Sequence, residues 1–303
     1  MSEPQISICI PAFKAEKYLL ETLESVRAQT FAHWELIVVE DGSHDRTEEI
    51  VREFAGSVDQ PVRFERHPEN RGLPATRNTC IARAVAPFVA LLDSDDLWTP
   101  DHLANLVQRA SETGADLIHS GVVLFASETG EEIELRVASE KAIDEFPRSL
   151  FLADYAIQPS SVLLRRSLWG ETGGFDPNCR YVEDREFWMR LVRAGARVSY
   201  VPAITCRYRQ HSSAMSKNAA AMALGCAEVF ERNADWQAVP LDLRRQSAAE
   251  GWCSAGRIIM KEDPTLAQDY FGRALRHASG SPRLLAYWFA ATVLAISKRR
   301  QRI

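Results

Sequence analysis

The chain has 303 residues, of which 46% are apolar and 25% are charged, the balance of an ordinary globular protein. Its formal net charge is −5, from 36 Lys and Arg against 41 Asp and Glu. These values exclude a mainly disordered or low-complexity chain. They also argue against a general nucleic-acid-binding protein, because neutralising phosphates requires clustered cations.

The ends of the chain and its cysteines bear on where the protein works. The six cysteines contain no CxxC pair, which argues against a zinc–thiolate site and favours reduced, buried thiols. No basic stretch followed by an apolar core begins the chain, so no signal peptide is expected. The uncharged run Leu284–Ser297 has 14 residues, fewer than a membrane-spanning helix needs. We therefore expect a cytoplasmic protein.

The first 125 residues alternate short apolar runs with amphipathic ones. In chain order, the expected elements are strand Ile6–Ile10, helix Tyr18–Gln29, strand Leu36–Val39, helix Arg46–Phe54, strand Val62–Glu65, helix Pro74–Ala86, strand Phe88–Leu92, helix Asp101–Thr113 and strand Leu117–Phe125. This alternation predicts an α/β fold with a Rossmann-like, mostly parallel sheet flanked by helices. In such sheets, ligands bind at the carboxyl ends of the strands.

The alternation weakens after about Glu131. There we expect strand Ser161–Leu164, a helix from Glu183 to about Gly195, and strand Arg197–Val201. From Ala219 onward every segment is predicted to be helical: Ala219–Asn233, Leu243–Lys261, Thr265–His277 and Pro282–Lys298. We expect one domain over 1–218, with halves of about 1–125 and 126–218, and an all-helical C-terminal extension over 219–303.

The clearest chemical motif is Asp93-Ser94-Asp95-Asp96, directly after the strand Phe88–Leu92. Three carboxylates so close together repel one another, so they need a cation or full solvation. A divalent Mg²⁺ or Mn²⁺ that bridges to phosphate oxygens would fit this set. The alternative is a solvated turn that caps the following helix.

Two further motifs follow strands in the first half. Asp41, in Glu40-Asp41-Gly42-Ser43, could accept hydrogen bonds from a pyrimidine or a ribose, although a capped turn would look the same. Arg77 lies just inside the helix that follows Asn70-Arg71-Gly72, where it could pair with a phosphate or with an acidic turn. A surface arginine is the alternative.

Two motifs lie in the second half. Glu183-Asp184 begins a helix, where carboxylates are favoured by the helix dipole alone, and one of them could instead serve as a general base. His211 lies among hydroxyl residues, where a structural role and a ligand role are both open.

Taken in order, these motifs resemble the family 2 glycosyltransferases, the inverting enzymes of the GT-A fold. The resemblance covers roughly residues 4–216. It is carried by Ile10-Pro11-Ala12-Phe13, Asp41-Gly42-Ser43, Asn70-Arg71-Gly72, Ala75-Thr76-Arg77-Asn78, Asp93-Ser94-Asp95-Asp96, Gly173-Gly174-Phe175-Asp176 and Glu183-Asp184.

The resemblance implies a nucleotide-sugar donor, most often UDP-linked, with Mg²⁺ or Mn²⁺. The residues implied to bind the nucleotide are Pro11, Ala12, Phe13, Asp41, Arg77, Asp93 and Asp95. Those implied to hold the metal are Asp95, Asp96 and His211. Asp184 matches the catalytic base, and Glu183 and Trp188 fall on the acceptor side. The acceptor would be a glycan or a lipid-linked glycan of the cell envelope.

The chain also departs from the family pattern. Glu40 stands where many members have a second Asp, and we expect its longer side chain to point at the rim of the site. Arg207 and Arg209 are not followed by the Trp of a QxxRW motif, which argues against a processive, membrane-embedded polymerase.

Two functions other than sugar transfer are also compatible with parts of the sequence. A metal-dependent nucleotidyltransferase would need cations for a triphosphate near the first strand, where only Lys14 and Lys17 stand. A non-catalytic glycan- or protein-binding module would not need Asp41, Asp95, Asp96 and Asp184 together.

The last predicted helix is apolar nearly all round and is followed by Lys298-Arg299-Arg300 and Arg302. We expect it to pack against other helices. The alternative is a peripheral contact with the inner face of the plasma membrane through this helix.

Overall fold

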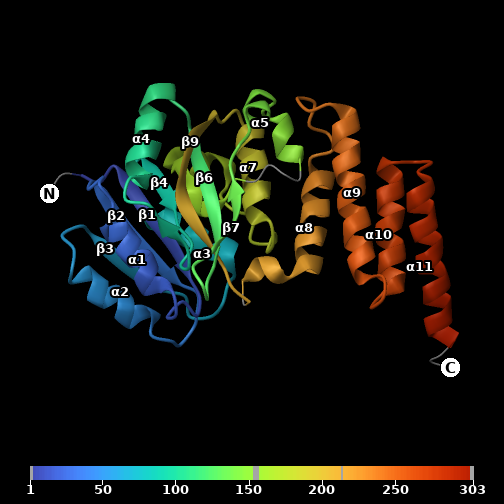
Figure 1. Cartoon of the computed structure of the whole chain (residues 1–303), viewed down its shortest axis with the longest axis horizontal. Coiled ribbons are helices and arrows are strands. Elements are labelled where there is room, and N and C mark those ends of the chain that lie inside the picture. Colours follow the sequence, from blue (N-terminus) through green and yellow to red (C-terminus); the bar gives the residue numbers. More distant parts are fainter. Residues whose placement is uncertain (1–2, 153–156, 213, 301–303) are drawn as a thin grey trace. The chain divides into compact units, whose positions relative to one another are not determined.

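The computed structural model describes residues 3–152, 157–212 and 214–300 (Figure 1). The chain divides into two compact units, each considered by itself. Unit 1 is made of residues 1–144 and 156–212, and unit 2 is made of residues 145–155 and 213–303.

Unit 1 is built on one nine-stranded sheet in the order β3-β2-β1-β4-β8-β6-β9-β5, with β7 paired to β6. The strands are β1 Ile6–Ala12, β2 Trp34–Glu40, β3 Val62–Arg66, β4 Phe88–Leu91, β5 Leu97–Trp98, β6 Leu117–Ala126, β7 Glu132–Arg136, β8 Val162–Arg165 and β9 Val198–Gln210. Strands β3, β2, β1 and β4 are parallel, β8 is antiparallel to both its neighbours, and β6 is parallel to β9. The predicted α/β class is confirmed, with a sheet that is parallel in its first four strands and mixed beyond them.

Helices cover both faces of this sheet (Figure 1). Because successive residues of a strand point to opposite faces, Ile6, Ile8 and Ile10 of β1 share one face. There they join a core with α1 Leu19–Arg27, α2 Thr47–Ala55 and α4 His102–Thr113. On the other face, the Cys9 thiol meets Cys80 of α3 Leu73–Arg83.

Strand β9 is longer than the sequence predicts. It continues through Pro202 to Gln210, whereas the expected strand stops at Val201. The pairing with β6 jumps from Ser120↔Val201 to Gly121↔Ile204, so the proline lies in a bulge where it interrupts no pairing. The continuation brings Arg209 opposite Phe125 and beside the acidic motif. The short strands β5 and β7 were not expected.

Shorter helical segments complete unit 1. They are α5 Glu140–Asp144, the 3₁₀ turn Pro159–Ser161, α6 Arg166–Thr172 and α7 Glu183–Arg193. Helix α7 follows Val182, whose φ of 53° is a left-handed conformation that a β-branched residue rarely adopts. The chain therefore turns sharply just before Glu183 and Asp184.

Unit 2 is a series of helices, each packed on the next. They are α8 Ala219–Arg232, α9 Leu241–Ile259, α10 Pro264–His277 and α11 Pro282–Arg300, with 3₁₀ turns at Arg148–Phe151 and Met215–Lys217. Trp252, Ala267 and Phe271 are buried in the core that these helices share. None of the helices in the described part of the chain is both long and apolar enough to span a membrane.

Candidate functional site

The parallel order of β1, β2, β3 and β4 brings the turns that follow them to one edge of the sheet. The backbone N–H of Asp41 donates to the carbonyl of Ala12 (2.8 Å), and that of Lys14 donates to the hydroxyl of Ser43 (3.0 Å). The turns after β1 and β2 are thereby joined. Pro11 and Ala12 are buried, whereas the Phe13 side chain is 46% exposed, so Phe13 presents an apolar ring at this edge.

Asp41 organises the neighbouring turn. Its Oδ1 accepts hydrogen bonds from His67 Nδ1 (2.7 Å) and from the Arg71 N–H (2.9 Å), and its Oδ2 accepts one from the Gly72 N–H (2.8 Å). Burial acts to raise the pKa of Asp41, but these hydrogen bonds outweigh it and hold the pKa below its usual value. The carboxylate is therefore ionised, and most of its acceptor capacity is used within the chain.

Glu40 differs from its expected position. Its side chain is fully buried: Oε1 accepts from the Ser43 N–H and hydroxyl, and Oε2 accepts from Arg66 Nε (2.8 Å). The expectation that Glu40 points at the rim of the site is wrong, because the longer side chain folds back beneath the turn and satisfies Ser43.

Arg77 lies at the centre of the site. Its guanidinium is almost fully buried and binds Asp93 Oδ1 through Nη2 (2.7 Å) and Glu183 Oε1 through Nη1. Burial acts to lower the pKa of Arg77, but Asp93 and Glu183 raise it overall. One cation therefore joins the acidic motif after β4 to the start of α7, and its side chain does not face solvent.

The two carboxylates at the start of α7 have raised pKa values. Burial raises the pKa of Glu183 to about 7, with Arg77 opposing and the charge of Asp184 adding to the rise. Burial also raises the pKa of Asp184, against the Arg185 N–H, which donates to Asp184 Oδ1 (2.7 Å), and against Arg77. Asp184 Oδ2 makes no hydrogen bond to the described residues, so it can accept a proton.

Each carboxylate of the motif Asp93-Ser94-Asp95-Asp96 has a different partner. Asp93 pairs with Arg77, and Asp95 Oδ2 lies 2.8 Å from His211 Nε2. Asp96 is fully buried, and burial followed by the charges of Asp95 and Asp93 raises its pKa well above the usual value. The three carboxylates thus have separate partners, but the charges of Asp93 and Asp95 still act on Asp96.

Two residues that sequence reasoning missed hold Asp96. Ser160 donates its hydroxyl to Asp96 Oδ2 (2.6 Å) and accepts the Asp93 N–H (3.0 Å). Arg209 donates its backbone N–H to Asp96 Oδ1 (2.9 Å) and its Nε–H to the Asp95 carbonyl (2.7 Å). Both are distant from the motif in sequence, and only the long β9 brings Arg209 there.

Trp188 is buried within the packing of α7. Its ring is buried against Phe175 and Phe187, and its Nε1–H donates to the Ile157 carbonyl (3.0 Å). The position of Trp188 therefore offers no support for an acceptor contact. Its packing instead fixes α7, which carries Glu183 and Asp184.

The side chains at this edge can be compared with the ligands that the expected metal needs. No group of three or more His, Cys, Asp or Glu within the described ranges is placed to hold an ion. Asp95 and His211 are in contact and partly exposed, and Mg²⁺ is commonly held by one or two protein ligands together with substrate phosphates. These two residues fit such a shared site, whereas both oxygens of Asp96 already accept hydrogen bonds inside the protein.

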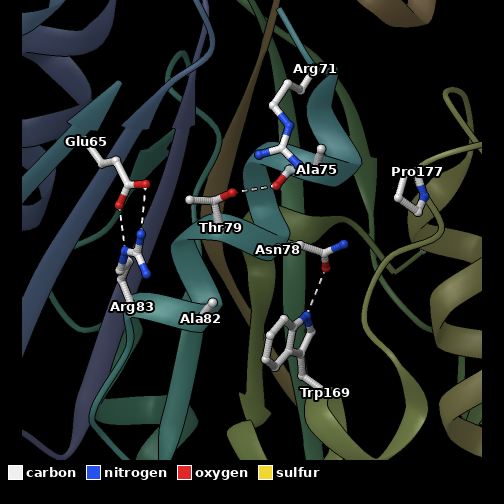
Figure 2. Close-up of a pocket in the computed structure, with 9 residues that line it drawn as sticks. All are labelled: Glu65, Arg71, Ala75, Asn78, Thr79, Ala82, Arg83, Trp169 and Pro177. Carbon is white, nitrogen blue, oxygen red and sulfur yellow. Dashed lines mark hydrogen bonds and ion pairs between the residues drawn. The ribbon is translucent and has the colours of Figure 1, made fainter. Parts of the chain in front are cut away.

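A groove of about 360 Å³ lies beside α3, and Figure 2 shows its lining. Arg71 lies over the start of α3, Asn78 accepts a hydrogen bond from Trp169 Nε1 (2.9 Å), and Glu65 pairs with Arg83. Among the described residues, Glu65 is the one carboxylate that lines the groove. The groove is therefore separate from the acidic edge, although Arg71 belongs to the turn that Asp41 holds.

Several known proteins are similar in sequence to this chain. The chain is 27% identical over 216 residues to the putative teichuronic acid biosynthesis glycosyltransferase TuaG of Bacillus subtilis, covering 71% of this chain and 83% of that protein. It is 26% identical over 223 residues to the UDP-Glc:alpha-D-GlcNAc-diphosphoundecaprenol beta-1,3-glucosyltransferase WfgD of Escherichia coli, covering 72% and 82%.

The fold has a counterpart among solved structures. A crystal structure of residues 1–349 of S. aureus TarS in complex with UDP-GlcNAc superposes with a TM-score of 0.71 at 18% identity, over 97% of this chain and 88% of that one. The predicted GT-A fold is thereby confirmed. The family model described as "Glycosyl transferase family 2" matches residues 7–170. Since that is more than half of the sequence, the chain belongs to glycosyltransferase family 2.

Proposed function

We propose that the protein is an inverting, metal-assisted glycosyltransferase that moves a sugar from a UDP-sugar to a hydroxyl of a glycan or lipid-linked acceptor. The observation that carries this proposal is the position of Asp184. Its carboxylate has a raised pKa and one oxygen without a partner among the described residues, and Arg77 links the start of its helix to the acidic motif at the donor edge.

The donor is assigned to the edge formed by the turns after β1, β2 and β4. The exposed ring of Phe13 would pack on the base, and Asp41 would hold the turn Asn70-Arg71-Gly72 in place beside it. Asp93 and Asp95, which are partly exposed, would face the ribose and the diphosphate. The UDP-Glc in the name of WfgD and the UDP-GlcNAc bound to TarS support a UDP-linked donor.

Asp95 and His211 would hold the divalent ion together with the diphosphate. A bound Mg²⁺ or Mn²⁺ supplies positive charge to the diphosphate oxygens as the bond to the sugar breaks. Asp96, which is buried and hydrogen-bonded to Ser160 and Arg209, would act as a positioning residue for the turn that carries Asp95. Arg77 would likewise position Asp93 and Glu183 and would not bind the phosphates itself.

Asp184 would act as the general base. Its free oxygen would take the proton of the acceptor hydroxyl. The hydroxyl oxygen would attack the anomeric carbon from the side opposite the diphosphate as the bond between sugar and diphosphate breaks and UDP leaves. Attack from that side inverts the configuration. General-base catalysis of this kind contributes about 10²- to 10⁴-fold to the rate.

The test compares Asp184→Asn with Glu186→Gln. Both remove a carboxylate from α7, but Glu186 pairs with Arg190 and is not part of the proposed site. We expect Asp184→Asn to bind UDP as the unchanged protein does, by calorimetry, and to lose about 10²- to 10⁴-fold in transfer of sugar to acceptor. Glu186→Gln should keep its activity. Full transfer by Asp184→Asn would remove the base assignment.

The metal assignment has its own test. UDP binding should be tighter with Mn²⁺ than without it, and Asp95→Asn should remove most of that difference. If UDP binds equally with and without Mn²⁺, the metal-assisted mechanism is wrong. The released product separates the other functions: pyrophosphate would indicate a nucleotidyltransferase, and binding of a UDP-sugar without turnover on any acceptor would indicate a binding module.

A further inference from the structure

Helix α11 buries one face and exposes another that is also apolar. Leu284, Ala291 and Ala295 are buried in unit 2, where α11 packs on α10. Besides Leu294, four other large apolar side chains of α11 are between 39% and 65% exposed: Leu285, Phe289, Val293 and Ile296. Their spacing of four, four and three residues places them on one face of the helix. We call these four residues the apolar stripe.

The charged residues of the segment that carries the stripe all have one sign. The sequence from Pro282 to Ile303 contains five basic residues and no acidic one. Arg283 stands at the start of the helix and Lys298 in its last turn, and Arg299, Arg300 and Arg302 follow Lys298 in the sequence. The stripe therefore lies on a stretch without charge that is bounded at both ends by cations, a pattern complementary to an apolar layer with an anionic surface.

We propose that α11 lies in the surface of an anionic lipid bilayer. The apolar stripe would enter the boundary of the acyl chains, and the basic residues at the two ends would meet the phosphates of the lipid headgroups. Amphipathic helices bind bilayers in this way, and each Lys or Arg near an anionic surface adds to the attraction. Because no described helix of this chain meets the length and apolarity of a membrane span, the contact would be peripheral.

The same charges argue against a second copy of this chain as the occupant. A symmetric contact through α11 would bring two copies of the same helix together. Each copy would carry the basic residues of its own end, and neither helix has a carboxylate to pair with them. Burying the stripes against each other would therefore concentrate like charges, whereas anionic lipids would neutralise them.

This proposal does not depend on the transfer reaction. It would bring the protein to a membrane, where a lipid-linked acceptor would be found, but vesicle binding can be measured without donor or acceptor. Failure of the proposed activity and failure of membrane binding are therefore distinguishable.

The experiment measures co-sedimentation of the full chain with vesicles of phosphatidylglycerol, and separately of phosphatidylcholine. We expect binding to the anionic vesicles only, weakened by salt. Replacing Phe289 and Val293 together by Ser should lower the partition coefficient at least tenfold. Replacing Lys298, Arg299 and Arg300 together by Gln should lower it by about 100-fold.

The matched control replaces Ile133 and Val137 together by Ser. These side chains are about as exposed as Phe289 and Val293 but belong to unit 1. This control should bind vesicles as the unchanged protein does, and far-UV circular dichroism should show that all variants are folded.

Two outcomes would overturn the proposal. One is a folded protein that does not bind anionic vesicles, or that binds them equally well without Phe289 and Val293. The other is a dimer by light scattering that becomes a monomer on replacing Phe289 and Val293, with vesicle binding unchanged, which would assign the stripe to a second copy of the chain.

Discussion

Arg77 has an unusual electrostatic environment, because it is almost fully buried between two carboxylates from distant segments of the chain. A buried ion pair adds little when it replaces well-packed apolar groups, but removing one partner leaves the others uncompensated. The contribution of Arg77 to stability therefore depends on whether Asp93 and Glu183 are ionised, and so it depends on pH.

We expect Arg77→Met to lower the free energy of unfolding by about 3–5 kcal/mol at pH 8. The folded-state pKa of Glu183, about 7, lies above its unfolded value, so its ionisation costs stability as the pH rises toward 7. Without Arg77 the folded-state pKa of Glu183 rises further, so ionising Glu183 costs more stability. The loss should therefore be smaller at pH 5, where Glu183 is protonated in the folded protein.

Urea unfolding at pH 5 and pH 8 measures this difference. The control is Arg83→Met on the same helix, whose ion pair with Glu65 is exposed and should contribute about 0–1 kcal/mol. An equal loss for Arg77→Met at both pH values would show that the ionisation of Glu183 is not what Arg77 compensates.

Gly42 is required by its conformation and by its neighbours. Its φ of 76° is left-handed, and a Cβ atom there would lie 2.5 Å from the Glu69 carbonyl carbon and 2.7 Å from the Asn70 nitrogen. Gly130 has a similar φ of 71° but no atom within 4 Å of the same position. Comparing Gly42 with Gly130 therefore separates the cost of backbone strain from the cost of a clash with the turn beside Asp41.

We expect Gly130→Ala to cost about 1–2 kcal/mol, the price of the left-handed backbone alone. Gly42→Ala should cost more, and it should also weaken UDP binding, because the backbone of Glu69 and Asn70 must move. Chemical unfolding and calorimetry on both variants provide the comparison. Equal losses in stability, with UDP binding intact in both, would contradict the clash.

At the scale of the elements, the sequence predicts most of unit 1 and all four long helices of unit 2. Apolar periodicity is sufficient there because each strand or helix buries one continuous set of side chains. It fails at β9, where Pro202 indicates an end although a bulge accommodates it. It also misses β7, where Ile133 and Leu135 alternate with charged residues but are both exposed, so the strand buries no face in the core.

The candidate site was predictable in part for the same reason. Residues directly after buried strands, such as Asp41 and Asp93, could be placed at one edge because parallel strands end together. Ser160 and Arg209 could not, because their contacts with Asp96 depend on the antiparallel β8 and on the full length of β9, which no local pattern indicates.

Close packing between helices α9 and α10 provides a prediction about elements. A Cβ atom at Gly256 of α9 would lie 2.7 Å from the ring of Phe271, whereas at Gly272 of α10 the nearest atom is 3.8 Å away. Replacing a helical glycine by alanine gains about 1 kcal/mol of helix propensity. Gly272→Ala should therefore stabilise the protein by about that amount.

We expect Gly256→Ala to destabilise the protein instead, by about 1–3 kcal/mol, because the ring of Phe271 is fully buried and has no space to move. Thermal unfolding shows directly whether each variant is more or less stable than the unchanged protein. If Gly256→Ala is as stable as Gly272→Ala, then α9 and α10 can separate without cost.

For the whole molecule, the two buried histidines of unit 1 should make their own contribution to stability depend on pH, because their pKa values are strongly lowered. Burial lowers the pKa of His102 to about 3, against Asp101 and Thr205, and that of His119 to about 4. Both are neutral in the folded protein, whereas in the unfolded chain they titrate near pH 6.5. The described histidine of unit 2, His277, lies beside Glu231 and is not buried.

At these two histidines the unfolded chain therefore binds more protons than the folded one between about pH 6.5 and pH 4, so their contribution to stability falls as the pH is lowered through that range. The raised pKa values of Glu183, Asp184 and Asp96 act in the opposite direction. At pH 5 each histidine should cost unit 1 about 2 kcal/mol relative to pH 7. His102→Gln should remove about half of that combined loss, because glutamine has no charge to gain. Urea unfolding at pH 7 and pH 5 measures this change in the free energy of unfolding. If His102→Gln leaves the change between the two pH values as it is in the unchanged protein, other groups govern the acid sensitivity of unit 1.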